Sequence, residues 1–431
     1  MEKELIIEGY WWLPETPEHR LAGELYLASN EVFKLKVFGD ILNCSNSLVE
    51  FIKDKESIPN VVFGKDSNGK DWTLFVSSRG GGSFNFSSTF PLIYFNIRQC
   101  LKGIHTLSIE DKCFKEIKVD IESLTSWVNY YPLQLNIPCS EDKRVIGFNL
   151  SYSSLEGDKE YNIGDDYMMT ICASVSYPNV HSEEVIIMQK QLLVFESKNS
   201  VSCSELLNKV LRFQMFLNIA TFRINRILRL RLYKHDLDNK VSKTDEGVEL
   251  FIRQDVYDSN DFKKKDDVNS YLFQLSTIED VFSQMLVKWF SFDNKVIPIL
   301  RHLMDSIPNK KTFKSTDYLI IAQALEGYHH RFVEVDPRSR RKLPERYKDI
   351  IRIFNNEVKA IRSINVKEAV DTRNYYSHFY EPHESHKILI GKELYQLTEK
   401  MRYLLICCLL REIGISNPLI NIILEEYCSK K

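Results

Sequence analysis

A turn signal between two strand-like runs lies at residues 61–76, which read Val61-Val-Phe-Gly-Lys-Asp-Ser-Asn-Gly-Lys-Asp-Trp-Thr-Leu-Phe-Val76. The runs on both sides are rich in β-branched and aromatic residues, the usual composition of strands. Asn68-Gly69 between them favours the positive φ angles that both central positions of a two-residue hairpin turn need. The stretch therefore predicts a β-hairpin. Similar short runs occur at Phe33–Phe38, Ile117–Ile121 and Val185–Met188.

These runs predict that residues 1–200 form a β-rich domain, either a sandwich-like pair of sheets or a rolled sheet. From residue 271 onward the apolar residues recur at helical spacing, so residues 271–431 are expected to form an all-α domain. The predicted fold class is therefore α+β and multidomain. Helices are expected at about 276–290, 294–306, 315–332, 344–361, 366–380, 391–413 and 416–428.

The region between the two predicted domains, residues 201–270, is expected to connect them. Residues 203–220 have the apolar spacing of a helix, whereas the spacing at 224–232 fits a strand as well as a helix. Residues 236–269 are polar and charged, and we place the domain boundary there.

Composition excludes several classes of protein. The formal net charge of the 431 residues is −2, so no global basic field indicates nucleic-acid binding. The nine cysteines are scattered without a C-x-x-C pair, which favours reduced thiols over a disulfide framework or a zinc ribbon. The apolar run Tyr403–Leu410 is too short to span a bilayer, and the acidic N-terminus lacks the features of a signal peptide. These features predict a cytoplasmic protein without membrane contact.

A late helix carries the residues that are suited to chemistry. Asn365 with Glu368 three residues on resembles a capping box, so the helix is expected to begin near Val366 and to end soon after residue 380, before Pro382. It contains Asp371-Thr-Arg-Asn-Tyr-Tyr-Ser-His-Phe379.

The polar residues of this stretch share one arc of the helical wheel, and the aromatic residues share the opposite arc. At about 100° per residue, Arg373 and His378 lie about 140° apart, so one helix alone is expected to bring them together poorly. Val366 and Val370 lie beside the Arg373 side of the wheel. This apolar patch is consistent with burial against a symmetric partner helix.

Arg373, Asn374 and His378 suit chemistry on a phosphodiester. The guanidinium of arginine binds phosphate oxygens and stabilises the charge that builds up on them. Histidine can take a proton from a nucleophile or give one to a leaving group, and asparagine can hold the substrate or orient the imidazole. If the nucleophile is the 2′-hydroxyl of RNA, no metal is needed, and the products are a 2′,3′-cyclic phosphate and a 5′-hydroxyl.

The pattern Arg373-Asn374-x-x-x-His378 in a helical C-terminal domain resembles the signature of HEPN ribonucleases, and the expected helix at Ala322–Phe332 is similar to another part of that domain. Gly9-Tyr-Trp-Trp-Leu-Pro14, followed by Gly23-Glu-Leu25 and Gly39, resembles the N-terminal domain of the ApeA-like family of anti-phage, abortive-infection proteins.

The resemblance implies a metal-independent endoribonuclease with no cofactor, whose HEPN domains pair as a homodimer or higher homo-oligomer around a composite site. Arg373, Asn374 and His378 would be catalytic. Many HEPN nucleases carry Glu followed four residues later by Lys or Arg. Here Glu326 is followed by His330, so Glu326 is expected either to orient a catalytic group or to pair with His330.

The densest basic run is expected to hold the RNA backbone, because phosphate contacts dominate nucleic-acid affinity. The RNA-binding residues predicted from it and its neighbourhood are Arg331, Arg338, Arg340, Arg341 and Lys342. We expect no metal site at His378, His383 and His386, because no Cys partner and no H-E-x-x-H pattern accompanies them. The glycine-rich segment Arg79–Ser83 lacks the ending of a phosphate loop and is expected to be a flexible hairpin or recognition loop.

Together these features predict a defence protein in which the β-rich half senses a phage-derived trigger, such as a protein, and the helical half cuts tRNA or another structured RNA. Two alternatives stay open. One is a non-catalytic HEPN module that binds RNA or protein beside a ligand-binding β domain. The other is a carbohydrate-binding β domain fused to a helical scaffold.

Overall fold

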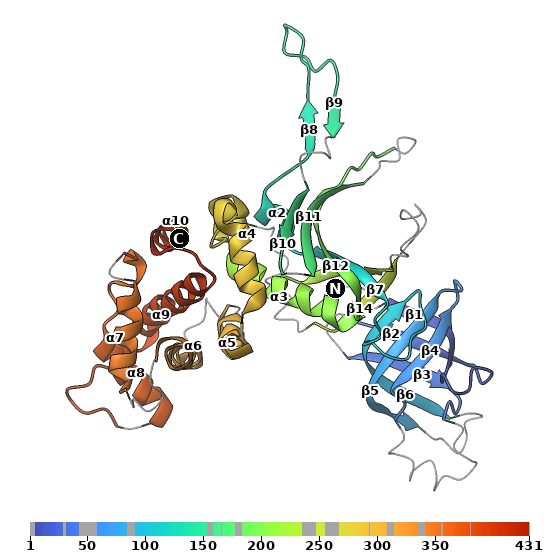
Figure 1. Cartoon of the computed structure of the whole chain (residues 1–431), viewed down its shortest axis with the longest axis horizontal. Coiled ribbons are helices and arrows are strands. Elements are labelled where there is room, and N and C mark those ends of the chain that lie inside the picture. The colour runs from blue at the N-terminus through green and yellow to red at the C-terminus, as the bar shows by residue number, and fades with distance from the viewer. Residues whose placement is uncertain are drawn as a thin grey trace. The chain divides into compact units, whose positions relative to one another are not determined.

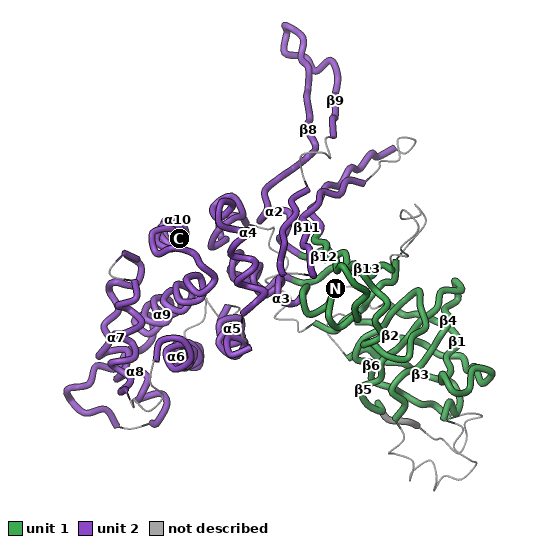
Figure 2. Tube along the Cα trace, viewed as in Figure 1, with its two compact units in different colours: residues 1–121, 193–210, 226–263 green, residues 122–192, 211–225, 264–431 purple. Residues whose placement is uncertain are grey.

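The chain divides into two compact units, each built from three segments (Figure 2). Unit 1 comprises residues 1–121, 193–210 and 226–263, and unit 2 comprises residues 122–192, 211–225 and 264–431. None of the described helices is both long enough and apolar enough to cross a membrane. The computed structural model describes residues 5–28, 32–42, 58–83, 91–152, 158–164, 166–176, 183–234, 247–254, 267–292, 294–307, 314–334, 341–354, 357–379 and 381–430.

Unit 1 contains a closed six-stranded antiparallel barrel (Figure 1). The hydrogen-bonded order is β1-β2-β3-β6-β5-β4, and β4 pairs again with β1, which closes the ring. The sequence prediction of a β-rich region followed by helices is confirmed, with the rolled form of the sheet. The strands are β1 Leu5–Trp12, β2 Leu21–Leu27, β3 Phe33–Phe38, β4 Val61–Asp66, β5 Asp71–Ser83 and β6 Leu92–Lys102.

The barrel core forms because apolar residues alternate along each strand and point inward. Trp11 is fully buried and lies against Gly23 and Gly64 of the neighbouring strands. A Cβ atom added at Gly64 would stand 2.2 Å from the Trp11 ring, so only glycine lets the indole pack there. The glycine-rich segment 79–83 belongs to β5 and pairs with the next strand, β6, so of the two expected forms it is part of a hairpin and not a recognition loop.

The predicted hairpin at residues 61–76 is confirmed, but its turn differs from the expected two-residue form. Only Gly69 has a positive φ, of 76°, and its amide donates to the Asp66 carbonyl at 2.9 Å. The buried Asp66 carboxylate also accepts bonds from the backbone amides of Asn68 and Lys70 and from the Trp72 indole. Burial alone would raise the pKa of Asp66, but these donors hold it below its usual value.

Further strands extend the sheet of unit 1 in the order β12-β7-β13-β14, and β14 pairs with β6. The segment at 224–232, left open between strand and helix, forms a strand, whereas Val185–Met188 is irregular, so the strand expected there is wrong. The predicted helix at 203–220 is confirmed as α3. The elements are β7 Phe114–Ile121, β12 Gln189–Val201, α3 Cys203–Thr221, β13 Ile227–Tyr233 and β14 Val248–Ile252.

Unit 2 begins with short elements and continues into the helices of the C-terminal region (Figure 1). The short elements are α2 Leu124–Val128, the paired strands β8 Leu133–Asn136 and β9 Asn149–Tyr152, and the paired strands β10 Lys159–Asn162 and β11 Tyr167–Val175. The helices are α4 Leu275–Ser291, α5 Ile297–Ser306, α6 Ser315–Tyr328, α7 Leu343–Ile353, α8 Val366–His378, α9 Gly391–Glu412 and α10 Asn417–Ser429.

The helical prediction from residue 271 onward is confirmed, with two helices shorter than expected. The helix expected over 344–361 ends at Ile353, and the helix expected over 366–380 ends at His378. α6 continues into a π-helical turn, His329–Val333. The centre of this region is α9, which is buried along most of its length and is packed against α6 and α10.

Candidate active site on helix α8

Helix α8 begins as the capping signal predicted. The Asn365 side chain accepts bonds from the backbone amides of Lys367 and Glu368 at 3.1 and 3.3 Å. At the other end, Phe379 adopts a left-handed conformation, and its amide donates to the Tyr375 carbonyl at 2.9 Å. The predicted catalytic residues of α8 therefore lie in its last two turns.

Arg373 is held by Glu326 of α6. Its Nε donates to Glu326 Oε1 at 3.0 Å and its Nη2 to Oε2 at 3.3 Å, a two-point contact between fork and carboxylate. The two side chains are 23% and 20% exposed, so the pair lies at the edge of the helical core and within reach of solvent. His330 pairs instead with Glu334, at 2.7 Å. Of the two partners expected for Glu326, the structure shows Arg373 and not His330.

Arg373 also contacts the other two residues of the motif. Its Nη1 lies 3.2 Å from His378 Nε2 and 3.4 Å from Asn374 Oδ1. The expectation that one helix brings Arg373 and His378 together poorly is wrong, because the long arginine side chain spans the angle between them. All four predicted catalytic residues therefore meet within one chain.

The contact between Arg373 and His378 also specifies a tautomer. A guanidinium only donates hydrogen bonds, so the imidazole Nε2 that faces it must accept, and the proton of the neutral ring is then on Nδ1. The His378 side chain is exposed to solvent. The one basic lone pair of that ring is then on Nε2, so a substrate hydroxyl must displace the Arg373 contact before the imidazole can accept its proton.

Two buried tyrosines beneath the site were missed by sequence reasoning. Tyr318 of α6 donates to the Ala369 carbonyl at 2.5 Å and thereby ties α6 to α8. Tyr347 of α7 is completely buried, and its hydroxyl has no hydrogen-bond partner. Burial raises the pKa of both phenols, so both stay neutral next to the charges of Arg373 and Glu326. Nothing in the spacing of these tyrosines separates them from ordinary core residues.

The apolar patch expected to face a partner helix is partly covered by the chain itself. Val370 is buried together with Ala369 and Thr372, while Val366 is half-buried. The Thr372 hydroxyl accepts from the Leu389 amide at 3.2 Å. Val370 therefore belongs to the core of the protomer, and the patch expected there for a partner is wrong at this residue.

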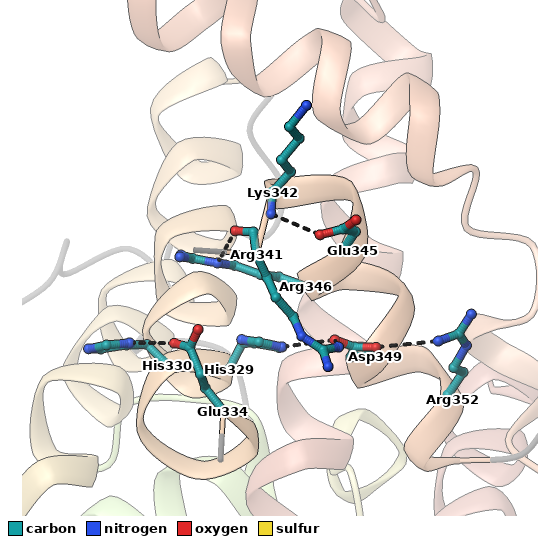
Figure 3. Close-up of polar contacts among 9 residues, drawn as sticks. All are labelled: His329, His330, Glu334, Arg341, Lys342, Glu345, Arg346, Asp349 and Arg352. Carbon is teal, nitrogen blue, oxygen red and sulfur yellow. Dashed lines mark hydrogen bonds and ion pairs between the residues drawn. The ribbon is translucent and has the colours of Figure 1, made fainter. Parts of the chain in front are cut away.

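The described part of the basic run, Arg341 and Lys342, lies at the start of α7, where Arg341 pairs with an acidic residue (Figure 3). Asp349 accepts from Arg341, from the buried His329 at 3.2 Å and from Arg352 at 3.4 Å. Burial alone would raise the pKa of Asp349, but the bonds from His329 and Arg341 hold it below its usual value. Arg341 stays half-exposed, so its cation is partly open to solvent.

The other predicted RNA-binding residues differ in their contacts and in whether the structure describes them. Lys342 precedes the first turn of α7, where its amide donates to Glu345, and it is exposed. Arg331 donates to the Lys295 carbonyl. Arg338 and Arg340 lie outside the described residues.

No group of three His, Cys, Asp or Glu side chains within the described residues could hold a metal ion. His383 is occupied locally, with its Nδ1 3.0 Å from the Ser385 hydroxyl. All eight cysteines in this part of the chain are free thiols.

Comparison with protein families gives two matches. The family described as ApeA N-terminal domain 1 matches residues 6–289, and the family described as Apea-like HEPN matches residues 319–419. Arg373, Asn374, His378 and Glu326 all lie inside the second match. Comparison with curated proteins and with solved structures gives no significant match.

Proposed function

Because the chain belongs to the ApeA family and joins an ApeA N-terminal domain to an Apea-like HEPN domain, we propose that it is a metal-independent endoribonuclease of anti-phage defence. The observation that carries the proposal is the contact of Arg373 with both the half-buried Glu326 and the exposed His378. HEPN domains are typically found in metal-independent ribonucleases. Here His378 can supply the base and Arg373 the cation that such a reaction needs without a metal.

Glu326 binds Nε and Nη2 of Arg373, while Nη1 contacts His378 and Asn374. In the proposed reaction the substrate displaces the contact between Nη1 and His378, so that Nη1 donates to a phosphate oxygen and the imidazole Nε2 is available to accept a proton. His378 takes the proton of the ribose 2′-hydroxyl, and the 2′-oxygen attacks the adjacent phosphorus. The bond to the 5′-oxygen breaks, and that oxygen receives a proton. The products are a 2′,3′-cyclic phosphate and a 5′-hydroxyl end, with Arg373 stabilising the charge on the phosphoryl oxygens.

The proton for the leaving 5′-oxygen needs a second acid, and a second copy of α8 would supply one. We therefore expect a homodimer in which two His378 side chains serve one phosphate, one as base and one as acid. We expect Arg341 and Lys342 to contact the RNA backbone, together with Arg331, Arg338 and Arg340. In this proposal tRNA or another structured RNA is cut in the cytoplasm once a phage-derived trigger reaches the N-terminal domain.

The test is cleavage of total RNA by the purified full-length chain in the presence of EDTA, with and without lysate of phage-infected cells as the source of trigger. We expect fragments that carry cyclic-phosphate and 5′-hydroxyl ends, absent in His378→Ala and Arg373→Ala. His383→Ala and Arg301→Ala are matched controls, because each removes the same type of side chain from an exposed position outside the site. Intact RNA under all conditions, with RNA still bound, would instead support a non-catalytic binding module.

A further inference from the structure

Phe379, the residue directly after His378, is unusually exposed. Its side chain is 86% exposed, the highest value among the exposed large hydrophobic residues of the described chain. A single large apolar group exposed to water is common on protein surfaces, so its meaning depends on what lies beside it. Here that group stands next to the imidazole of the proposed active site.

The backbone of Phe379 is also unfavourable. Its φ of 56° and ψ of 31° lie in the left-handed region, which ends many helices but is normally occupied by glycine. A bulky residue there is a conformational outlier. Glycine could make the same bond to the Tyr375 carbonyl without strain, and the ring gains no burial in exchange. Strain kept at such a position points to a use for the ring itself.

The neighbouring groups indicate which ligand the ring would meet. Nη1 of Arg373 and the exposed His378 ring offer contacts to a phosphate and a ribose hydroxyl, so a nucleotide held there has its base close by. Unpaired bases bind to proteins by stacking on aromatic faces. A base inside a duplex is already stacked on its neighbours and offers no free face.

We propose that Phe379 is a stacking platform for an unpaired base next to the scissile phosphate, so that the substrate class is single-stranded or loop RNA. The inference rests on the proposed ribonuclease function. Stacking accepts any base, since each has a π-face, so this contact selects for unpaired structure and not for sequence. Its loss should weaken binding by about 5- to 150-fold, which corresponds to the stacking energy of a single base on an aromatic ring.

The test separates binding from cleavage in the full-length chain. For binding, His378→Ala keeps the RNA intact, and a hairpin RNA with 2-aminopurine in its loop reports stacking by fluorescence quenching. We expect quenching with His378→Ala, its loss when Phe379→Ala is added, and its return with Phe379→Tyr. For cleavage, Phe379→Ala alone should raise KM for loop RNA by about 5- to 150-fold and change kcat by less than about threefold. Ile422→Ala, which removes another exposed apolar side chain of unit 2, is the matched control.

Each outcome decides the proposal. Equal quenching and equal KM for Phe379→Ala and the unsubstituted chain would overturn it, as would a shift of Phe379→Ala from dimer to monomer, since the ring would then pack against a second copy. Quenching that depends on Phe379 in a chain that never cleaves RNA would reject the nuclease and keep the stacking site. A chain that neither binds nor cleaves RNA would reject both. Phe379→Gly keeps the helix end without strain and should melt at or above the temperature of the unsubstituted chain, so a loss of binding in that variant is not a loss of fold.

Discussion

Replacing Glu326 with glutamine tests whether this carboxylate positions the proposed catalytic arginine. Glutamine keeps one acceptor oxygen but loses the charge and one of the two bonds to Arg373, which measure 3.0 and 3.3 Å. A charge-assisted bond contributes about 1.5–3 kcal/mol when buried, and partial exposure of this pair reduces the expected loss to about 1–2 kcal/mol. For a domain of this size that corresponds to a fall in Tm of about 2–8 °C.

The fall in catalytic rate should be larger than the small loss of folding stability can explain. A displacement of a catalytic group by about 1 Å can cost about a hundredfold in rate, so we expect Glu326→Gln to lower kcat by about ten- to a hundredfold. The assay is single-turnover cleavage of a labelled RNA, with melting followed by circular dichroism. Glu368→Gln is the matched control, because Glu368 lies on α8 but pairs with the exposed Lys387. A Glu326→Gln enzyme as fast as the control would refute the positioning role.

Three further outcomes concern stability. Gly64→Ala should destabilise the barrel by about 1–3 kcal/mol, measured by urea unfolding, because the added Cβ would overlap the Trp11 ring. The pKa of Asp66 is lowered in the folded chain. The carboxylate therefore stabilises the fold above its unfolded pKa near 3.9, and this stabilisation is lost as the pH falls through the folded pKa. Asp66→Asn should lose less stability between pH 5 and pH 3 than the unsubstituted chain does, measured by urea unfolding at each pH. Tyr318→Phe should cost about 1–2 kcal/mol, seen as a lower midpoint of chemical denaturation, because the buried Ala369 carbonyl loses its donor.

Local sequence pattern predicted the elements that depend on local forces. The alternation in Phe33–Phe38 defines β3 to the residue, and the Asn365 cap marks the start of α8. β14 lies at Val248–Ile252, inside a stretch that reads as polar and charged, and it is a strand because β6 and β13 pair with it there. Conversely, Val185–Met188 has strand composition but lies in irregular structure.

The candidate site also has a part that the sequence predicted and a part that only the folded structure shows. The spacing of Arg373 and His378 indicated the chemistry, but a wheel follows only Cα directions and ignores the length of a side chain. The guanidinium extends far enough along α8 to contact an imidazole that the wheel places on another face. The pairing of Arg373 with Glu326 joins residues 47 positions apart, and only the packing of α6 against α8 brings them together.

The order of the segments along the chain has a consequence for synthesis. The last segment of unit 1 ends at residue 263, and His378 follows about 115 positions later. At about 5–20 residues per second, the ribosome completes every segment of unit 1 on the order of ten seconds before the imidazole is made. A chain whose synthesis stops before residue 373 therefore contains the strands of unit 1 but neither Arg373 nor His378, the two residues of the proposed catalytic contact.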